Sequence, residues 1–243
     1  MGKVWVGTSG YSYQHWKEIF YPKGLAQSKW LEFYAQHFEC VEINATFYRH
    51  FERHVFERWH DVTPVSFRFA IKGPKTITRD KRLEGAEEDL ARFLGSAAGL
   101  GEKLGVILWQ LPPSFKNDEE GFARLQSFIA LLPANISHAF EFRHPSWVGP
   151  KVMELLDNGC AGWVSADSRR FVSAEAVTGG VGYYRYHGPK ELYSSSYSAE
   201  AIASLGNSLR PLADIGDAYC FFNNDFCGYA LENGKQLQQE ITK

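Results

Sequence analysis

The segment Leu104-Gly-Val-Ile-Leu-Trp-Gln-Leu111 is a near-continuous apolar run that ends abruptly at Pro112-Pro113. A short apolar run bounded by turn residues is typical of a strand that is buried on both faces, as in a parallel sheet covered by helices. Amphipathic stretches with helical spacing flank it at residues 85–98 and 119–132. This arrangement of helix, strand and helix predicts a repeating β/α architecture.

The same pattern of an apolar, β-rich run followed by a helical stretch recurs along the whole chain. The predicted strands span residues 4–8, 40–45, 66–71, 104–111, 136–142, 161–166, 181–187 and 218–223. The predicted helices span residues 28–36, 54–60, 85–98, 119–132, 151–157, 199–213 and 229–241. Alternation of this kind indicates a parallel sheet with helical crossovers, and eight strands favour closure into a barrel. We therefore predict an α/β protein in which residues 1–243 form a single (β/α)8, TIM-like barrel domain.

Two segments depart from the regular repeat. Residues 168–180, between the sixth and seventh predicted strands, hold no strong helical pattern, so we expect a loop or a degenerate β/α unit there. Residues 11–27 form a long connection after the first strand and are expected to cover one end of the barrel.

Composition narrows the class of protein further. The chain has 243 residues, 44% of them apolar, which is enough for a substantial core. A net charge of -2 provides no global field for nucleic acid, which makes nucleic acid an unlikely partner, although a local basic patch stays open. There is no run of about 18 apolar residues and no secretory signal at the N-terminus. We therefore predict a cytoplasmic protein with no membrane partner. The four cysteines form no Cys-x-x-Cys pair and are expected to be buried and reduced.

Polar side chains recur on one face of six predicted strands. Side chains alternate between the two faces of a strand, and in a barrel one of these faces points inward. The polar residues that share a parity within their strands are Glu42, Asn44 and Thr46; Arg68 and Lys72; Gln110; Glu141 and Arg143; Ser165 and Asp167; and Arg185 and His187. Most of them lie at the C-terminal ends of strands, where barrel enzymes place their chemistry. Because buried charges are costly unless they are paired or used, we predict a polar pocket at this mouth. A purely structural charge network is the alternative.

The residues of this pocket suggest two roles. The candidate catalytic acids and bases are Glu42, Glu141, Asp167 and His187. The candidate substrate-binding residues are Ser9, Asn44, Lys72, Gln110, Arg143, His144, Arg185 and Asn223. Arginine forks suit phosphate or carboxylate groups, so the expected partner is a small anionic molecule. Glu141 is expected to stay ionised beside Arg143, and Glu42 is expected to pair with Lys72 on the neighbouring strand.

Two strand-end loops allow more than one interpretation. The backbone N–H groups of Gly7-Thr-Ser-Gly10 are placed to approach an anion, but a tight turn is the alternative. His144 is expected either to contact a ligand or to form a local hydrogen bond.

Three hypotheses about function follow. The first is an acid/base enzyme, a lyase, isomerase or hydrolase, that acts on a small phosphate- or carboxylate-bearing substrate without a cofactor. The second is a divalent-metal-dependent hydrolase or nuclease of phosphoesters that uses Glu42, Glu141, Asp167 and His187 as ligands. The cations nearby and the lack of His-x-His or His-Glu-x-x-His patterns count against a metal. The third is a non-catalytic protein that binds a small ligand.

Several strand-end motifs together resemble the YecE-like family, also called domain-of-unknown-function family 72. The motifs are Gly7-Thr-Ser-Gly-Tyr11 with Trp16 and Tyr21-Pro22, Glu42-Ile-Asn-Ala-Thr-Phe-Tyr48, Phe69-Ala-Ile-Lys72-Gly-Pro74, Gln110-Leu-Pro-Pro113, Glu141-Phe-Arg-His144-Pro-Ser-Trp147 and Tyr184-Arg-Tyr-His-Gly188. The resemblance covers nearly the whole chain and implies a TIM barrel. It carries no established activity, so it implies candidate positions but no reaction. The segment after Lys72 reads Pro-Lys-Thr-Ile-Thr-Arg and lacks a histidine that the resemblance leads us to expect there.

Overall fold

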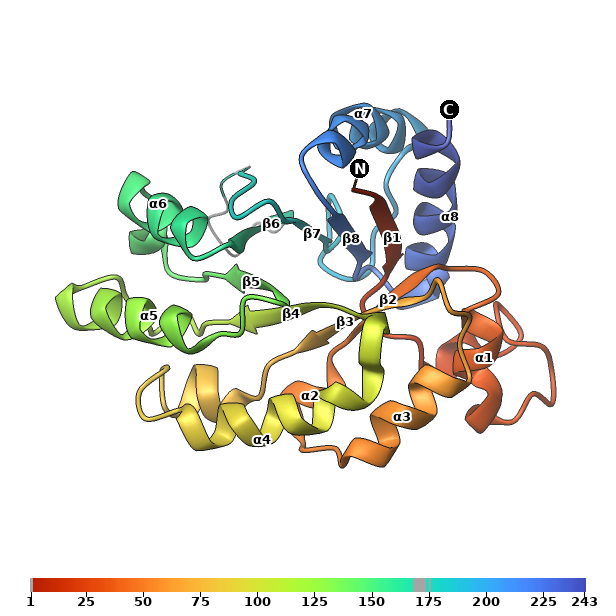
Figure 1. The fold of residues 1–243 in the computed structure, drawn as a ribbon. Coiled ribbons are helices and arrows are strands. Elements are labelled where there is room, and N and C mark those ends of the chain that lie inside the picture. Colours follow the sequence, from red (N-terminus) through yellow and green to blue (C-terminus); the bar gives the residue numbers. More distant parts are fainter. Residues whose placement is uncertain (1, 168–173, 175) are drawn as a thin grey trace.

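Eight parallel strands pair in chain order, and the last strand pairs with the first to close a barrel (Figure 1). The computed structural model describes residues 2–167, 174 and 176–243. The strands are β1 (Val4–Thr8), β2 (Cys40–Ile43), β3 (Arg68–Lys72), β4 (Leu104–Gln110), β5 (Ser137–Glu141), β6 (Ala161–Asp167), β7 (Gly182–Tyr186) and β8 (Ala218–Phe222). The predicted barrel and the positions of all eight strands are therefore confirmed.

The helices surround the strands on the outside of the barrel (Figure 1). They are α1 (Trp30–Tyr34), α2 (Ala45–Tyr48), α3 (Arg53–Asp61), α4 (Glu87–Ala97), α5 (Glu119–Leu131), α6 (Pro150–Asn158), α7 (Ala199–Leu209) and α8 (Tyr229–Ile241). The short α2 was not predicted, because the chain turns into a helix directly after β2. The prediction for residues 168–180 falls largely on 168–173 and 175, which lie outside the described residues. Across the described ranges, no helix is long and apolar enough to cross a membrane.

Two separate apolar layers fill the barrel and its surroundings. One lies inside the barrel and includes Ala70, Leu108, Ala139, Val164 and Phe221. The larger layer lies between the strands and the helices. Because the residues of each strand alternate between the two layers, membership of a layer shows which parity points inward.

Membership of the two layers agrees with the predicted inward face for most strands, but not for β6. In β6 the inner layer holds Val164, whereas Trp163 belongs to the outer layer. Ser165 and Asp167 share the parity of Trp163, so they point away from the barrel interior, and the predicted inward orientation is wrong. The Ser165 hydroxyl donates to the carbonyl of Ala174 at 3.0 Å. In a strand that is apolar on both faces, a polar residue at the end does not reveal which face is inside.

The cysteines fulfil the sequence prediction only in part. Cys40 and Cys220 are buried, but Cys160 and Cys227 are exposed. Cys160 lies in a turn after α6 and Cys227 at a kink in the 3-10 helix Phe226–Gly228, both with positive φ, 51° and 60°. The apolar run beside Cys160 therefore did not indicate that this residue is buried.

Candidate functional site

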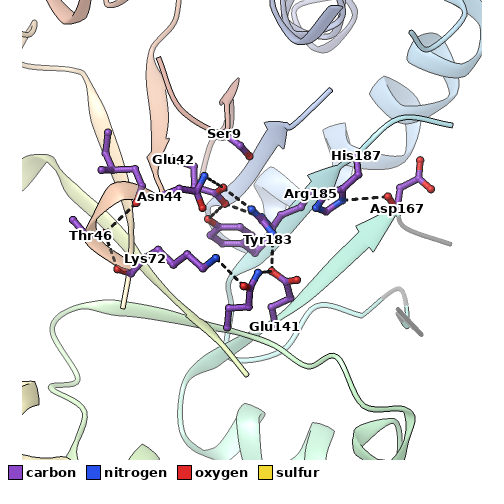
Figure 2. Close-up of polar contacts among 12 residues, drawn as sticks. Ser9, Glu42, Asn44, Thr46, Lys72, Glu141, Asp167, Tyr183, Arg185 and His187 are labelled. Atoms are coloured by element: carbon purple, nitrogen blue, oxygen red, sulfur yellow. Dashed lines mark hydrogen bonds and ion pairs between the residues drawn. The ribbon is translucent and has the colours of Figure 1, made fainter. Parts of the chain in front are cut away.

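Arg185, at the C-terminal end of β7, binds two carboxylates from distant strands (Figure 2). Its Nε and Nη2 donate to Oε2 and Oε1 of Glu42 at 2.9 and 2.8 Å. Its Nη1 donates to Oε2 of Glu141 at 2.7 Å. All three side chains are at most 3% exposed. A buried guanidinium and two buried carboxylates thus form one ionic centre, which we call the Glu42–Arg185–Glu141 centre.

Further polar groups satisfy the carboxylate oxygens of this centre. Tyr183 donates its hydroxyl to Oε2 of Glu42 at 2.7 Å, and Asn44 donates to Oε1 at 3.0 Å. On the other side, Gln110 and Arg143 donate to the two oxygens of Glu141 at 2.8 and 2.9 Å. Tyr183 was not among the predicted site residues. It lies two residues before Arg185 on the same face of β7, and this shared parity was the signal that identifies it.

The ionic centre keeps both glutamates charged. Burial by itself raises the pKa of Glu42, but Arg185 outweighs this effect and lowers the pKa below its ordinary value. Burial also raises the pKa of Glu141. The positive charges of Arg185, Arg143 and Lys72 lower it by more, so that the pKa lies far below its usual range. The expected ionisation of Glu141 is therefore supported. Carboxylates held so strongly in the charged form are weak bases and do not supply protons at neutral pH.

Lys72, at the end of β3, does not form the expected ion pair with Glu42. Its Nζ instead donates to Oε1 of Gln110 at 2.8 Å and lies 4.2 Å from the ring centre of Phe47. The side chain is buried. Burial, and secondarily the charge of Arg185, lowers the pKa of Lys72 to about 7, against the opposing effect of the carboxylates. A substantial fraction of this amine is therefore uncharged at neutral pH.

His187, which follows β7, is a second uncharged group at the mouth. It is fully buried, and its Nδ1 lies 3.2 Å from the backbone carbonyl of Asp167. Because a carbonyl only accepts, we assign the proton to Nδ1, which leaves a lone pair on Nε2. Among the described residues Nε2 has no hydrogen-bond partner. Burial, followed by the charge of Arg185, lowers the pKa of His187 to about 4.

The first strand contributes a buried hydroxyl to the mouth. The nearby Ser9 hydroxyl lowers the pKa of Glu42 and so favours its ionised form. The Ser9 hydroxyl oxygen itself has no well-formed hydrogen bond to any described group. The backbone N–H groups of Thr8, Ser9 and Gly10 bond to the Tyr34 hydroxyl, to a carbonyl of β8 and to the carbonyl of Thr8. The loop is therefore a tight turn whose amides are used within the protein, and the anion-binding interpretation is not supported.

The remaining predicted residues lie around the rim or outside it. The Asp167 carboxylate is exposed and accepts from the Tyr197 hydroxyl at 2.6 Å, away from the ionic centre (Figure 2). His144 accepts at Nδ1 from the backbone N–H of Ser146 at 3.1 Å, so it forms a local hydrogen bond. Asn223 follows β8 with the inward parity of Phe221 and is partly exposed.

The four residues considered as metal ligands do not converge on one point. Glu42 and Glu141 both face Arg185, while Asp167 points outward and His187 bonds through Nδ1 to the backbone carbonyl of Asp167. In the described part of the chain, no group of three or more His, Cys, Asp or Glu side chains is arranged to hold a metal ion.

A small cavity opens at the same end of the barrel, beyond Phe47. Its volume is about 60 Å³, and it lies between the ends of β2 and β3 and the beginning of α4. Its lining residues are Thr46, Phe47, Tyr48, Arg49, His50, Pro74, Lys75, Thr76, Asp89, Arg92 and Phe93. Three cations against one carboxylate make its walls predominantly basic.

The fold is similar to that of DUF72 family proteins and, more distantly, to that of an epimerase. A DUF72 family protein from Thermotoga maritima has a TM-score of 0.88 and 30% sequence identity over 99% of each chain. One from Enterococcus faecalis has a TM-score of 0.85 and 22% identity over 99% of this chain and 96% of that one. A D-allulose 3-epimerase from Methylomonas sp. has a TM-score of 0.58 and 10% identity over 100% of this chain and 97% of that one, which shows a shared fold alone.

Two curated relatives of similar sequence are both named UPF0759 proteins. The UPF0759 protein YunF of Bacillus subtilis is 26% identical over 96% of this chain and 93% of its own length. The UPF0759 protein YecE of Escherichia coli is 31% identical over 59% of this chain, a match that spans half of YecE. The family model described as protein of unknown function DUF72 matches residues 5–243. This chain therefore belongs to the DUF72 family.

Proposed function

We propose that this protein is an enzyme that acts by acid/base catalysis on a small phosphate- or carboxylate-bearing substrate at the C-terminal mouth of the barrel. The observation that carries the proposal is the pair Lys72 and His187. Both are buried at strand ends, both have a lowered pKa, and neither is neutralised by an ion pair among the described residues. Acid/base catalysis requires a group that exchanges protons near neutral pH, which the pKa of Lys72 allows, and an uncharged acceptor such as His187 can assist it.

We assign the acid/base roles to Lys72 and His187 rather than to Glu42 and Glu141. Glu42 and Glu141 are bound to Arg185 through short hydrogen bonds, so we assign them to holding the centre and setting its electrostatic field. Lys72 takes the role of general acid or base, because its pKa of about 7 allows it to gain and lose a proton at neutral pH. His187, with a pKa of about 4, acts as a base or hydrogen-bond acceptor through Nε2.

Cations at the rim support an anionic substrate. Arg143 follows β5 at the mouth and keeps 21% of its side chain exposed while its Nε contacts Glu141. Arg49, Lys75 and Arg92 line the basic cavity beyond Phe47. Cations at these positions attract phosphate or carboxylate groups. The proposed location is the cytoplasm, which the four free cysteines support.

The test is a substrate screen with matched variants. The wild-type protein is incubated with sugar phosphates and hydroxy- or keto-acids, and their consumption is followed by proton and phosphorus NMR. We expect Lys72→Met and His187→Gln to lower turnover by about 10²-fold or more, the usual contribution of a general acid or base. Lys29→Met, which removes an exposed lysine of an i,i+3 ion pair, is the control and should not change it.

The outcomes separate the proposed enzyme from its alternatives. Full turnover by Lys72→Met would contradict the assigned role. Tight binding of an anion without consumption would favour a binding protein. Turnover that depends on added Mn²⁺ or Zn²⁺ and stops with chelator would favour the metal-dependent hydrolase instead.

A further inference from the structure

Lys72 differs from an ordinary buried lysine in what its amine contacts. Lys103 is also buried, but its Nζ donates to two carbonyls and a hydroxyl, those of His60 and Thr63, at 2.5, 2.8 and 3.4 Å. An ammonium has three N–H donors, and Lys103 has a hydrogen-bond acceptor for each of them. Among the described residues, the Nζ of Lys72 has one acceptor, the neutral amide oxygen of Gln110. Its surroundings therefore suit a neutral amine better than an ammonium.

From this arrangement we propose that Lys72 forms an imine with the carbonyl carbon of a small anionic aldehyde or ketone at the mouth of the barrel. The inference rests on the proposed function, because it names the substrate class of the same site. Uncharged lysine amines in apolar, partly cationic surroundings are the nucleophiles of enzymes that bind carbonyl substrates covalently.

The neighbours of Lys72 fit this role. The ring of Phe47 lies 4.2 Å from Nζ and forms one apolar wall of the amine's surroundings. The positive charges of Arg185 and Arg143 disfavour the ammonium form, and burial disfavours it most. The hydrogen bond to Gln110 fixes the direction of one N–H and leaves the nitrogen lone pair for attack. Gln110 is itself held by its bond to Glu141 at 2.8 Å.

The reaction balances without an oxidant or a reductant. The lone pair of Nζ forms a bond to the carbonyl carbon, and the electrons of the C=O π bond move to oxygen. Both hydrogens of the amine leave with that oxygen as water, and a C=N bond remains. Protonation of the imine nitrogen yields an iminium ion, whose positive charge is favoured by Glu141 and Glu42 and opposed by burial and by Arg185 and Arg143.

An iminium ion also acidifies the neighbouring carbon. Loss of a proton from that carbon gives an enamine, the intermediate of aldol cleavage and of isomerisation. His187 lies across the Glu42–Arg185–Glu141 centre from Lys72 (Figure 2). Its Nε2, which has no hydrogen-bond partner in the described part of the chain, is an uncharged base at this mouth. This places the expected reaction among lyases and isomerases of carbonyl compounds rather than among hydrolases.

The experiment is trapping of the imine by cyanoborohydride. The folded protein is incubated at pH 7.5 with pyruvate, dihydroxyacetone phosphate or glyceraldehyde 3-phosphate and the hydride donor. Adducts are then assigned to individual lysines by peptide mass spectrometry. A lysine with a pKa near 7 holds roughly 10²-fold or more neutral amine at this pH than an ordinary lysine. We expect saturable labelling of Lys72 at least about tenfold above that of Lys29 and Lys103.

Two variants, Lys72→Met and Lys72→Arg, and one internal comparison, Lys103, make the result decisive. Neither side chain has an amine that can form an imine, so both variants should lose the adduct. Lys72→Met places no charge in surroundings that suit a neutral group, and Lys72→Arg keeps a donor to Gln110. Lys103 shares burial and a lowered pKa with Lys72, so its expected lack of labelling shows that accessibility at the mouth matters. Equal labelling of all lysines, or no adduct at Lys72 with any of the three probes, would overturn the imine. The proposed acid/base function would survive that outcome if the NMR screen still showed turnover that depends on Lys72.

Discussion

At the scale of single residues, Arg185 determines the chemical state of the site. It compensates two carboxylates that would otherwise be buried without a counter-charge, and it disfavours the charged forms of Lys72 and His187. Burial is the main reason that the pKa values of Lys72 and His187 are lowered, and Arg185 adds to this effect while it helps to keep the two glutamates ionised. Breaking a buried ion pair from one side leaves an uncompensated charge, whereas removing the whole group is often tolerated.

This dual role gives a prediction about stability. We expect Arg185→Met to lower the free energy of unfolding by roughly 3–5 kcal/mol, measured by urea denaturation at pH 7. Adding Glu42→Gln and Glu141→Gln to that variant should recover part of the loss, because the repulsion and the desolvated charges disappear together. Arg53→Met, which removes an exposed i,i+4 pair with Glu57, is the control and should change stability by less than about 1 kcal/mol. A single Arg185→Met variant as stable as the wild type would contradict this account.

At the scale of elements, the close approach of β1 and β2 limits how the mouth is built. These two strands share only two paired positions, and one of them is Gly7 opposite Cys40. A Cβ at Gly7 would lie 2.2 Å from the backbone carbonyl oxygen of Cys40, which no side-chain movement relieves. Gly7 therefore allows β1, which Ser9 follows, to lie close to β2, which carries Glu42.

A matched pair of glycine substitutions tests this conclusion. Gly7→Ala should destabilise the protein by roughly 1–3 kcal/mol or more, because the clash is with backbone. Gly95→Ala in α4, where nothing lies within 4 Å of the added carbon, should stabilise it by roughly 0.5–1 kcal/mol. Thermal unfolding monitored by circular dichroism measures both. If the two substitutions had the same effect, the close approach of β1 and β2 would not limit stability.

At the scale of the whole molecule, the charges of the mouth link folding to pH in one direction. Glu42, Glu141, His187 and Lys72 all have a lower pKa in the folded chain than their ordinary values. Between the folded and the unfolded pKa of each group, the unfolded chain binds more protons. Stability therefore rises with pH through each interval. The interval runs from about 4 to 6.5 for His187 and from about 7 to 10.5 for Lys72.

We therefore predict that the free energy of unfolding increases from pH 4.5 to pH 9. Urea denaturation at pH 4.5, 6, 7.5 and 9 measures the profile. His187→Gln should flatten the acid part only partly, because buried His138 has a similarly lowered pKa of about 4. Lys72→Met should flatten the part above pH 7. If the free energy of unfolding fell between pH 4.5 and 7.5, the folded protein would not hold His187 uncharged and the two glutamates ion-paired, as we infer.

Much of the fold could be predicted because it depends on local patterns. The eight strands and the start and end of α8 follow from apolar runs, helical spacing and turn residues. The inward faces of most strands followed from alternation, as at Glu42 and Arg185. Prediction failed at Asp167, where both faces of β6 are apolar and the polar residue bonds to Tyr197 from a later loop instead.

The sequence by itself determined the barrel, the inventory of charged residues and the end of the barrel at which they gather. Only the tertiary structure decided which of them pair. Glu42 was expected to bind Lys72 on the adjacent strand, but it binds Arg185, 143 residues away and across the interior. Alternation fixes the direction of a side chain along its own strand, whereas a contact across the barrel depends on closure and register. The pKa values depend in turn on burial and on those contacts, which is why the neutral amine of Lys72 became apparent only in the folded protein.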